Sequence, residues 1–159
     1  MGIRNSVGTG FRRVVVGLDG SANSRRASAF VARLTPPRGG LVTFVRVVEP
    51  MRVPSMPLVP ASVRGQIAAQ ADTVNQEQIA RARRLVEAAA TKLERSGWRA
   101  RGVVRTGLPL PELHGAVRAA QGDLLVLGAR GAGAVTHFLL GSTAEAALKH
   151  ASVPVLIVK

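Results

Sequence analysis

Two glycine-containing motifs near the carboxyl end of the chain have residue types and a spacing suited to anion binding. Gly128 and Gly131 follow the apolar run Leu124–Leu127, and after nine further residues Gly141 and Ser142 precede a predicted helix. Glycines let the backbone approach a ligand closely, and the N–H groups at a helix N-terminus favour negative charge. The spacing therefore predicts a phosphate-binding loop, although glycine-rich loops also occur without a ligand.

A carboxylate and a helix-capping pair extend this prediction. Ser142 stands where a helix N-cap is expected, with Glu145 three residues later as the partner of a capping box. Asp19 follows the first β-branched run, Val14–Leu18, and begins the turn that leads to Ser21. A carboxylate opposite backbone amides suits a nucleotide, because it can bind ribose hydroxyls or a metal while the amides bind phosphates.

Hydrophobic periodicity predicts alternating strands and helices that would position these residues. Runs that are apolar on both faces indicate strands of a buried parallel sheet, whereas a spacing near 3.6 residues indicates helices. The alternation predicts a doubly wound sheet with right-handed crossovers, whose ligands bind beyond the carboxyl ends of the strands. The proline-rich segment 50–60 is expected to be irregular. The expected strands cover residues 12–18, 41–48, 98–105, 124–127 and 153–158, and the expected helices cover 21–34, 62–96, 109–120 and 144–150.

The longest of these helices, which begins at Ser62, is expected to place one apolar stripe on the sheet and a charged face in solvent. Glu77 and Arg81 are four residues apart on the charged side, so we interpret them as a surface ion pair. The apolar stripe consists of Val63, Ile67, Ala71, Val74, Ala82, Leu85, Val86, Ala89 and Leu93.

Composition narrows the class of protein. The chain has 159 residues, of which 47% are hydrophobic and 19% charged, as in a globular protein. We expect a flexible tail over residues 1–10 and a single domain over residues 11–159. Cysteine is absent, and no apolar run approaches the ~18 residues of a membrane span, so we expect a cytoplasmic protein without a membrane partner. The net charge of +13 favours anionic partners, but scattered arginines and only 3% aromatic residues argue against a nucleic-acid site.

Several common catalytic and nucleotide-binding patterns are missing from the sequence. It contains neither the P-loop motif nor a Gly-x-Gly-x-x-Gly motif after the first strand. Its histidines are dispersed and show no metal-ligand spacing with carboxylates. A Ser142, His137 and Asp19 triad can be assembled only on paper, because no nucleophile-elbow sequence supports it. We therefore predict no catalytic residues and no protein-held metal.

Taken together, the ordered segments resemble the universal stress protein family over about residues 12–159. The resemblance is carried by VVVGLDGS at 14–21, VRVVEP at 45–50 and ASVPVLIV at 151–158. The pattern Gly-x2-Gly-x9-Gly-Ser, met by Gly128, Gly131, Gly141 and Ser142, is similar to that of the ATP-binding branch of the family.

This resemblance implies a fold, a ligand and a set of contacts. The fold would be a three-layer α/β sandwich around a five-stranded parallel sheet of order 3-2-1-4-5, which is Rossmann-like and adenine nucleotide alpha hydrolase-like. The ligand would be ATP, accompanied by Mg²⁺ or Mn²⁺ held mainly by the phosphates. The backbone of Val47 would contact adenine, with Gly17 and Asp19 beside the base and ribose. The phosphates would be wrapped by Gly128, Ala129, Arg130, Gly131, Ala132, Gly133, Ala134, Gly141, Ser142 and Thr143.

Two departures from the family pattern limit what is carried over. Arg46 stands where many members have histidine, directly before the valine that would contact adenine. Ala132, Gly133 and Ala134 lack the side-chain donors that some relatives offer. Affinity for phosphate would therefore depend on backbone amides, Ser142 and Arg130.

The resemblance favours an ATP-binding regulatory stress protein that acts as a homodimer. The strand Val153–Val158 would pair the two copies, since an unpaired apolar edge is suited to such pairing. An unidentified protein would be the regulatory partner. The alternatives are a stress protein that binds no nucleotide, a module for polyanions or nucleic acids, and a slow ATP hydrolase.

Overall fold

A five-stranded parallel sheet forms the centre of the molecule, in the order β3-β2-β1-β4-β5. The computed structural model describes residues 10–131 and 140–159. The predicted α/β class and strand order are confirmed. The strands are β1 (Arg13–Gly17), β2 (Leu41–Val48), β3 (Arg99–Thr106), β4 (Leu124–Gly128) and β5 (Val155–Val158).

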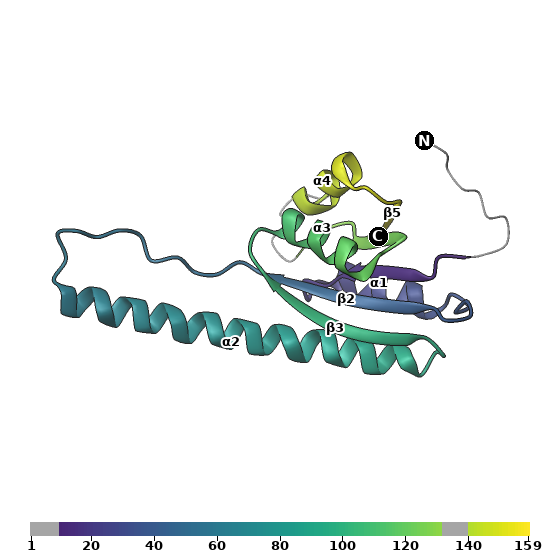
Figure 1. Cartoon of the computed structure of the whole chain (residues 1–159), viewed down its shortest axis with the longest axis horizontal. Helices are drawn as coiled ribbons and strands as arrows, with labels where there is room; N and C mark the ends of the chain where they lie inside the picture. Colours follow the sequence, from purple (N-terminus) through teal and green to yellow (C-terminus); the bar gives the residue numbers. More distant parts are fainter. Residues whose placement is uncertain (1–9, 132–139) are drawn as a thin grey trace.

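Helices cover both faces of this sheet, which gives three layers (Figure 1). Successive residues of a strand point to opposite faces, so Val14 and Val16 pack in one hydrophobic cluster and Val15 packs in the other. The first cluster lies under α1 and α2, and the second lies under α3 and α4. The helices are α1 (Ala22–Ala32), α2 (Ala61–Glu94), α3 (Pro109–Ala120) and α4 (Ser142–His150).

The two edges of the sheet differ in character. β3 pairs only with β2, so it forms one edge, and its residues alternate between polar and apolar. β5 forms the other edge and begins at Val155, not at the predicted Val153. Pro154 lacks an N–H group and contributes only its carbonyl, which accepts from the Leu125 amide at 2.9 Å.

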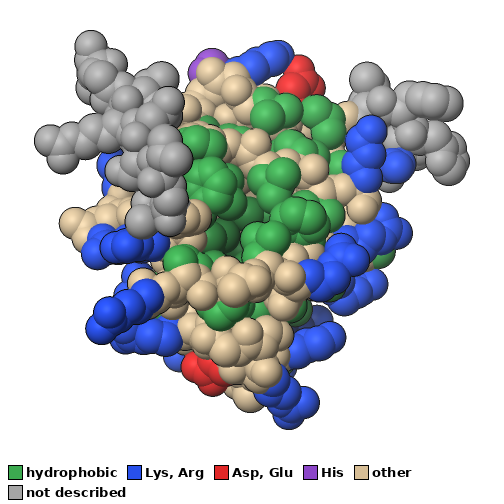
Figure 2. Space-filling model, turned by 90° about the vertical axis from the view of Figure 1, so that its right-hand side faces the viewer, with side chains coloured by type: hydrophobic (Ala, Val, Ile, Leu, Met, Phe, Trp, Pro, Cys, Tyr) green, Lys and Arg blue, Asp and Glu red, His purple; other side chains and the backbone are tan. Residues whose placement is uncertain are grey.

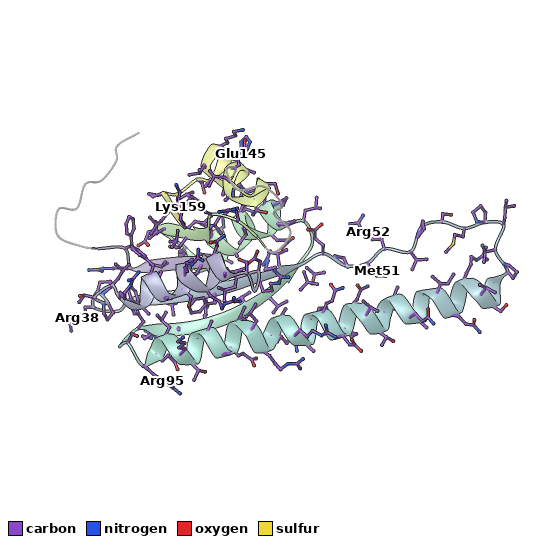
Figure 3. All side chains as sticks on the ribbon, turned by 180° about the vertical axis from the view of Figure 1, so that it is seen from behind. Arg38, Met51, Arg52, Arg95, Glu145 and Lys159 are labelled. Atoms are coloured by element: carbon purple, nitrogen blue, oxygen red, sulfur yellow. The ribbon has the colours of Figure 1, made fainter. Side chains whose placement is uncertain are left out.

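The first half of α2 extends well beyond the sheet (Figure 1). At about 1.5 Å per residue its 34 residues span about 50 Å, whereas the eight residues of β2 span only about 26 Å. The irregular segment 50–60 runs beside this half, and the stretch with Met51 and Arg52 is seen at its start in Figure 3. Asn75 fastens the segment, since its side chain accepts from the Met51 amide at 2.7 Å and donates to the Met51 carbonyl at 3.1 Å. We call residues 50–77 the arm.

The positive charge of the chain is spread around the body of the molecule. In the view of Figure 2, Lys and Arg side chains surround a central group of hydrophobic side chains, and few carboxylates are seen. This distribution agrees with the scattered arginines of the sequence. Within the described residues, no helix combines the length and the apolar character needed to cross a membrane.

Candidate functional site

A cavity of about 950 Å³ opens at the carboxyl end of the sheet. It lies where β1 has β2 on one side and β4 on the other, which is the point at which the strand order reverses. Ligands of doubly wound sheets bind at this position, because the crossovers on either side leave a crevice there. Most of the predicted site residues line the cavity: Gly17, Asp19, Val47, Gly128, Arg130, Gly131, Gly141, Ser142 and Thr143.

The β1–α1 turn places Asp19 beside the glycine loop. Its Oδ1 accepts from the Ser21 amide at 2.9 Å, which fixes the carboxylate in the turn. A Cβ built on Gly131 would lie only 2.8 Å from Oδ2 of Asp19. The absence of a side chain at Gly131 therefore gives the carboxylate its room, and the structure brings the two together as the sequence predicted.

The two ends of the loop are fastened to each other and to neighbouring elements. The Gly141 amide donates to the Ala129 carbonyl at 2.8 Å, and the Ala129 amide donates to Val158 in β5 at 2.7 Å. The Arg130 carbonyl accepts from the Ser21 hydroxyl at 3.2 Å. Ala129 itself is buried behind the cavity wall, so it holds the loop ends without lining the cavity. Ala132, Gly133, Ala134 and His137 lie outside the described residues.

The N-terminus of α4 lines the cavity without the predicted capping box. The N-cap is Gly141, which has no side chain, and Ser142 is the first helical residue. Glu145 does not reach back to the N-cap, because it forms an ion pair with Lys149 at 2.7 Å. This hydrogen bond, together with the positive charge, lowers the pKa of Glu145. The first amides of α4 therefore have no side-chain cap, and such amides attract anions.

Val47 presents its backbone at the same cavity. The β1–β2 pairing ends at Gly17 and Val45, and the Leu18 amide donates to the Val45 carbonyl at 2.8 Å. In a parallel ladder, residues two apart direct their N–H and C=O groups to the same side. Val47 therefore directs both groups toward β1 at a point where the β1 chain has already turned away. A donor and an acceptor side by side can recognise the edge of a flat polar ring.

Residues of α2 and α3 complete the wall of the cavity, and they were not predicted as site residues from the sequence. Gln78, Arg81, Ala82 and Leu85 lie at helical positions i, i+3, i+4 and i+7, so they share one face of α2. Arg81 does pair with Glu77 at 3.1 Å, as predicted, but it also lines the cavity. The available signal was Gln78, a polar residue that interrupts the apolar stripe of this helix. From α3, the cavity is lined by Pro109 and Leu113.

The family model for the universal stress proteins matches residues 10–159. The chain belongs to this family. It is 34% identical over 151 residues to the universal stress protein Rv1996 of Mycobacterium tuberculosis, covering 91% of this chain and 47% of the relative. This universal stress protein domain thus spans about half the length of the curated relatives that it matches.

Solved structures of the family share the fold of this chain. The hypothetical protein MJ0577 has a TM-score of 0.74 at 18% identity, covering 93% of this chain and 95% of its own. A universal stress protein in complex with cAMP has a TM-score of 0.61 at 21% identity, covering 93% and 96%. An Arabidopsis thaliana family protein with AMP bound has a TM-score of 0.57 at 19% identity, covering 92% and 90%.

Proposed function

We propose that this universal stress protein binds an adenine nucleotide in the cavity, with ATP as the expected ligand, and that occupancy regulates its interactions. The observation that carries the proposal is the convergence of three groups on one cavity. These are the backbone edge of Val47, the carboxylate of Asp19, and the N-terminus of α4 beside the glycine loop. They suit a purine ring, a ribose and a phosphate chain, in that order. The nucleotides held by two structural neighbours support the same ligand class.

The order of the three groups suggests how the nucleotide would lie. Adenine would meet the Val47 backbone beside Gly17, at the end of β1. The ribose would lie near Asp19, and the phosphates would extend to the first turn of α4, formed by Ser142 and Thr143. A divalent cation would take most of its ligands from the phosphates. The described residues contain no group of three or more metal-ligating side chains, and Asp19 and Glu49 are the carboxylates that line the cavity.

Calorimetric titration of the purified protein with ATP, ADP, AMP and cyclic AMP tests this proposal. We expect saturable binding of at least one of them and its loss in Gly141→Leu. Gly141 has φ −64°, which any residue adopts, and an added Cβ would lie 3.4 Å from the backbone of Arg130 and Gly131. The variant should therefore fold while its larger side chain obstructs the loop. Unchanged affinity in Gly141→Leu, or no binding of any of the four nucleotides, would contradict the proposal.

A matched control is available on the arm. Gly65 lies in α2, does not line the cavity, and would have open space around an added Cβ. Gly65→Leu therefore makes the same chemical change far from the proposed site, and it should bind nucleotide like the wild type. Circular dichroism of both variants establishes that they are folded.

We also propose that two copies associate through β5. This strand forms a sheet edge, and all four of its residues are partly exposed although all are apolar. Pro154 and Val158 direct their carbonyls to β4, so Val155 and Ile157 direct their backbone groups outward. Sedimentation velocity should show a dimer. Val155→Pro, which removes one outward N–H group, should weaken that dimer, and a wild type that sediments as a monomer would refute the pairing.

A further inference from the structure

Arg46 differs from the other arginines of the chain in its surroundings. Every arginine among the described residues is exposed except Arg46, Arg105 and Arg130. Arg105 is paired with Glu112 at 2.7 Å, and Arg130 lies at the loop end of the cavity. The side chain of Arg46 is also partly buried at the cavity wall, yet it forms no hydrogen bond or ion pair with any described residue. A partly desolvated guanidinium without an acceptor is unfavourable unless an anion binds it.

The position of Arg46 separates it from the phosphate loop. Arg46 lies two residues after Phe44 in β2, so its side chain points to the same face as that of Phe44, which packs under α1 and α2. The N-terminus of α4 belongs to the layer on the opposite side, over the second hydrophobic cluster. Arg46 and α4 therefore meet the cavity from different sides of the carboxyl edge.

Two side chains of α2, one of them cationic, add hydrogen-bond donors to the cavity on the side of Arg46. Gln78 and Arg81 line the cavity from the face of α2 that covers the end of β2. The partner of Arg81 is Glu77, in a pair whose side chains are 72% and 59% exposed. Such an exposed pair contributes little, so Arg81 can exchange Glu77 for a ligand oxygen at small cost. Glu49 also lines this region, but it is exposed and forms no ion pair with Arg46 among the described residues.

We propose that the α2 side of the cavity binds a second anionic group, so that the preferred ligand is an adenine nucleotide with a phosphate on its ribose in addition to the 5′ chain. The inference rests on the proposed nucleotide function. The 5′ chain would lead away from Arg46 toward α4, whereas a 2′ or 3′ phosphate would leave the ribose in another direction, and the remaining ribose hydroxyl would stay beside Asp19. The cavity, at about 950 Å³, is at the upper end of the range of ~300–1,000 Å³ for small-molecule sites, so it has room for this group.

The test compares AMP, ADP, adenosine 2′,5′-bisphosphate and adenosine 3′,5′-bisphosphate by calorimetry. We expect one bisphosphate to bind about tenfold more tightly than AMP, as a charge-assisted hydrogen bond in a partly exposed site would give. Arg46→Gln should remove this gain and leave the ratio of ADP to AMP affinity unchanged. Arg84→Gln removes the same charge from an exposed position of α2 outside the cavity, and it should retain the gain.

The outcomes separate this inference from the proposed function. If AMP binds but neither bisphosphate binds more tightly, the second anion site is refuted and the nucleotide function stands. If Arg46→Gln lowers the affinity for ADP relative to AMP as well, Arg46 serves the 5′ chain and the inference is wrong. If Glu49→Gln abolishes the gain as Arg46→Gln does, the two residues form a structural pair, which also refutes it. If no nucleotide binds, both proposals fail together. Melting temperatures of the variants exclude unfolding as the cause.

Discussion

Replacement of Gly128 by alanine should destabilise the protein through backbone crowding. A Cβ at this position would lie 2.6 Å from the carbonyl carbon of Asn23, 2.7 Å from the amide nitrogen of Ser24 and 2.8 Å from the Asn23 Cβ. Two of these atoms belong to the backbone of the first turn of α1, so no side-chain rotation can relieve the contacts. Either the end of β4 or the start of α1 must move.

The size of the effect follows from comparable substitutions. An inserted methyl group in a tightly packed site typically costs about 1–3 kcal/mol. For a domain of this size, each kcal/mol lowers the melting temperature by about 2–4 °C, so Gly128→Ala should melt about 2–12 °C below the wild type. Thermal unfolding followed by circular dichroism measures this shift directly.

Gly141→Ala is the matched control for this experiment. Its added Cβ would lie no closer than 3.4 Å to any neighbour, so its melting temperature should stay within about 2 °C of the wild type. The reasoning would be refuted if both variants melted within about 2 °C of the wild type, because the close approach of β4 to α1 would then have no energetic consequence. If both variants instead melted well below the wild type by the same amount, the loop would have a general requirement for glycine.

Two further predictions concern helix ends. Ser21→Ala removes the hydroxyl that accepts from the Ser24 amide at 3.1 Å and so caps α1; it should cost about 1 kcal/mol in the free energy of unfolding, measured by urea denaturation. Lys149→Met should raise the pKa of Glu145 toward its ordinary value, since the hydrogen bond and charge of Lys149 lower it. The pair therefore helps folding above the ordinary carboxyl pKa and loses its effect as the pH falls through the lowered one; an NMR titration in which the Glu145 pKa did not move would contradict this.

The fold was predictable because its signals are local and agree with one another. The buried strands are continuous β-branched runs, and β1 with Val14, Val15 and Val16 has no competing helical pattern. The edge strand β3 was recognisable because its arginines alternate with small apolar residues. Boundaries were less accurate: α1 ends at Ala32 instead of reaching Leu34, since residues close to Pro36 are disfavoured in helical conformation.

The site was only partly predictable because some of its residues are brought in by tertiary packing. Asp19 and the glycines follow strands directly, so strand prediction alone places them at the carboxyl edge. Arg81 and Gln78 lie on a helix whose register against the sheet is set by contacts distant in sequence. Their spacing showed that they share a face, but only the packing of α2 shows that this face meets the cavity.

The incorrect capping-box prediction clarifies why α4 is the suitable anion site. Three helices begin near the cavity, and two of them have few free donors there. The N-terminus of α1 is capped by Ser21, and the first turn of α3 contains Pro109 and Pro111, which lack N–H groups. At α4 the N-cap is Gly141, so no N-cap side chain occupies the amides of its first turn. A serine cap there would satisfy one of the donors that a phosphate requires. The glycine at 141 therefore matters less for its own flexibility, since its φ is ordinary, than for leaving these amides available at the cavity.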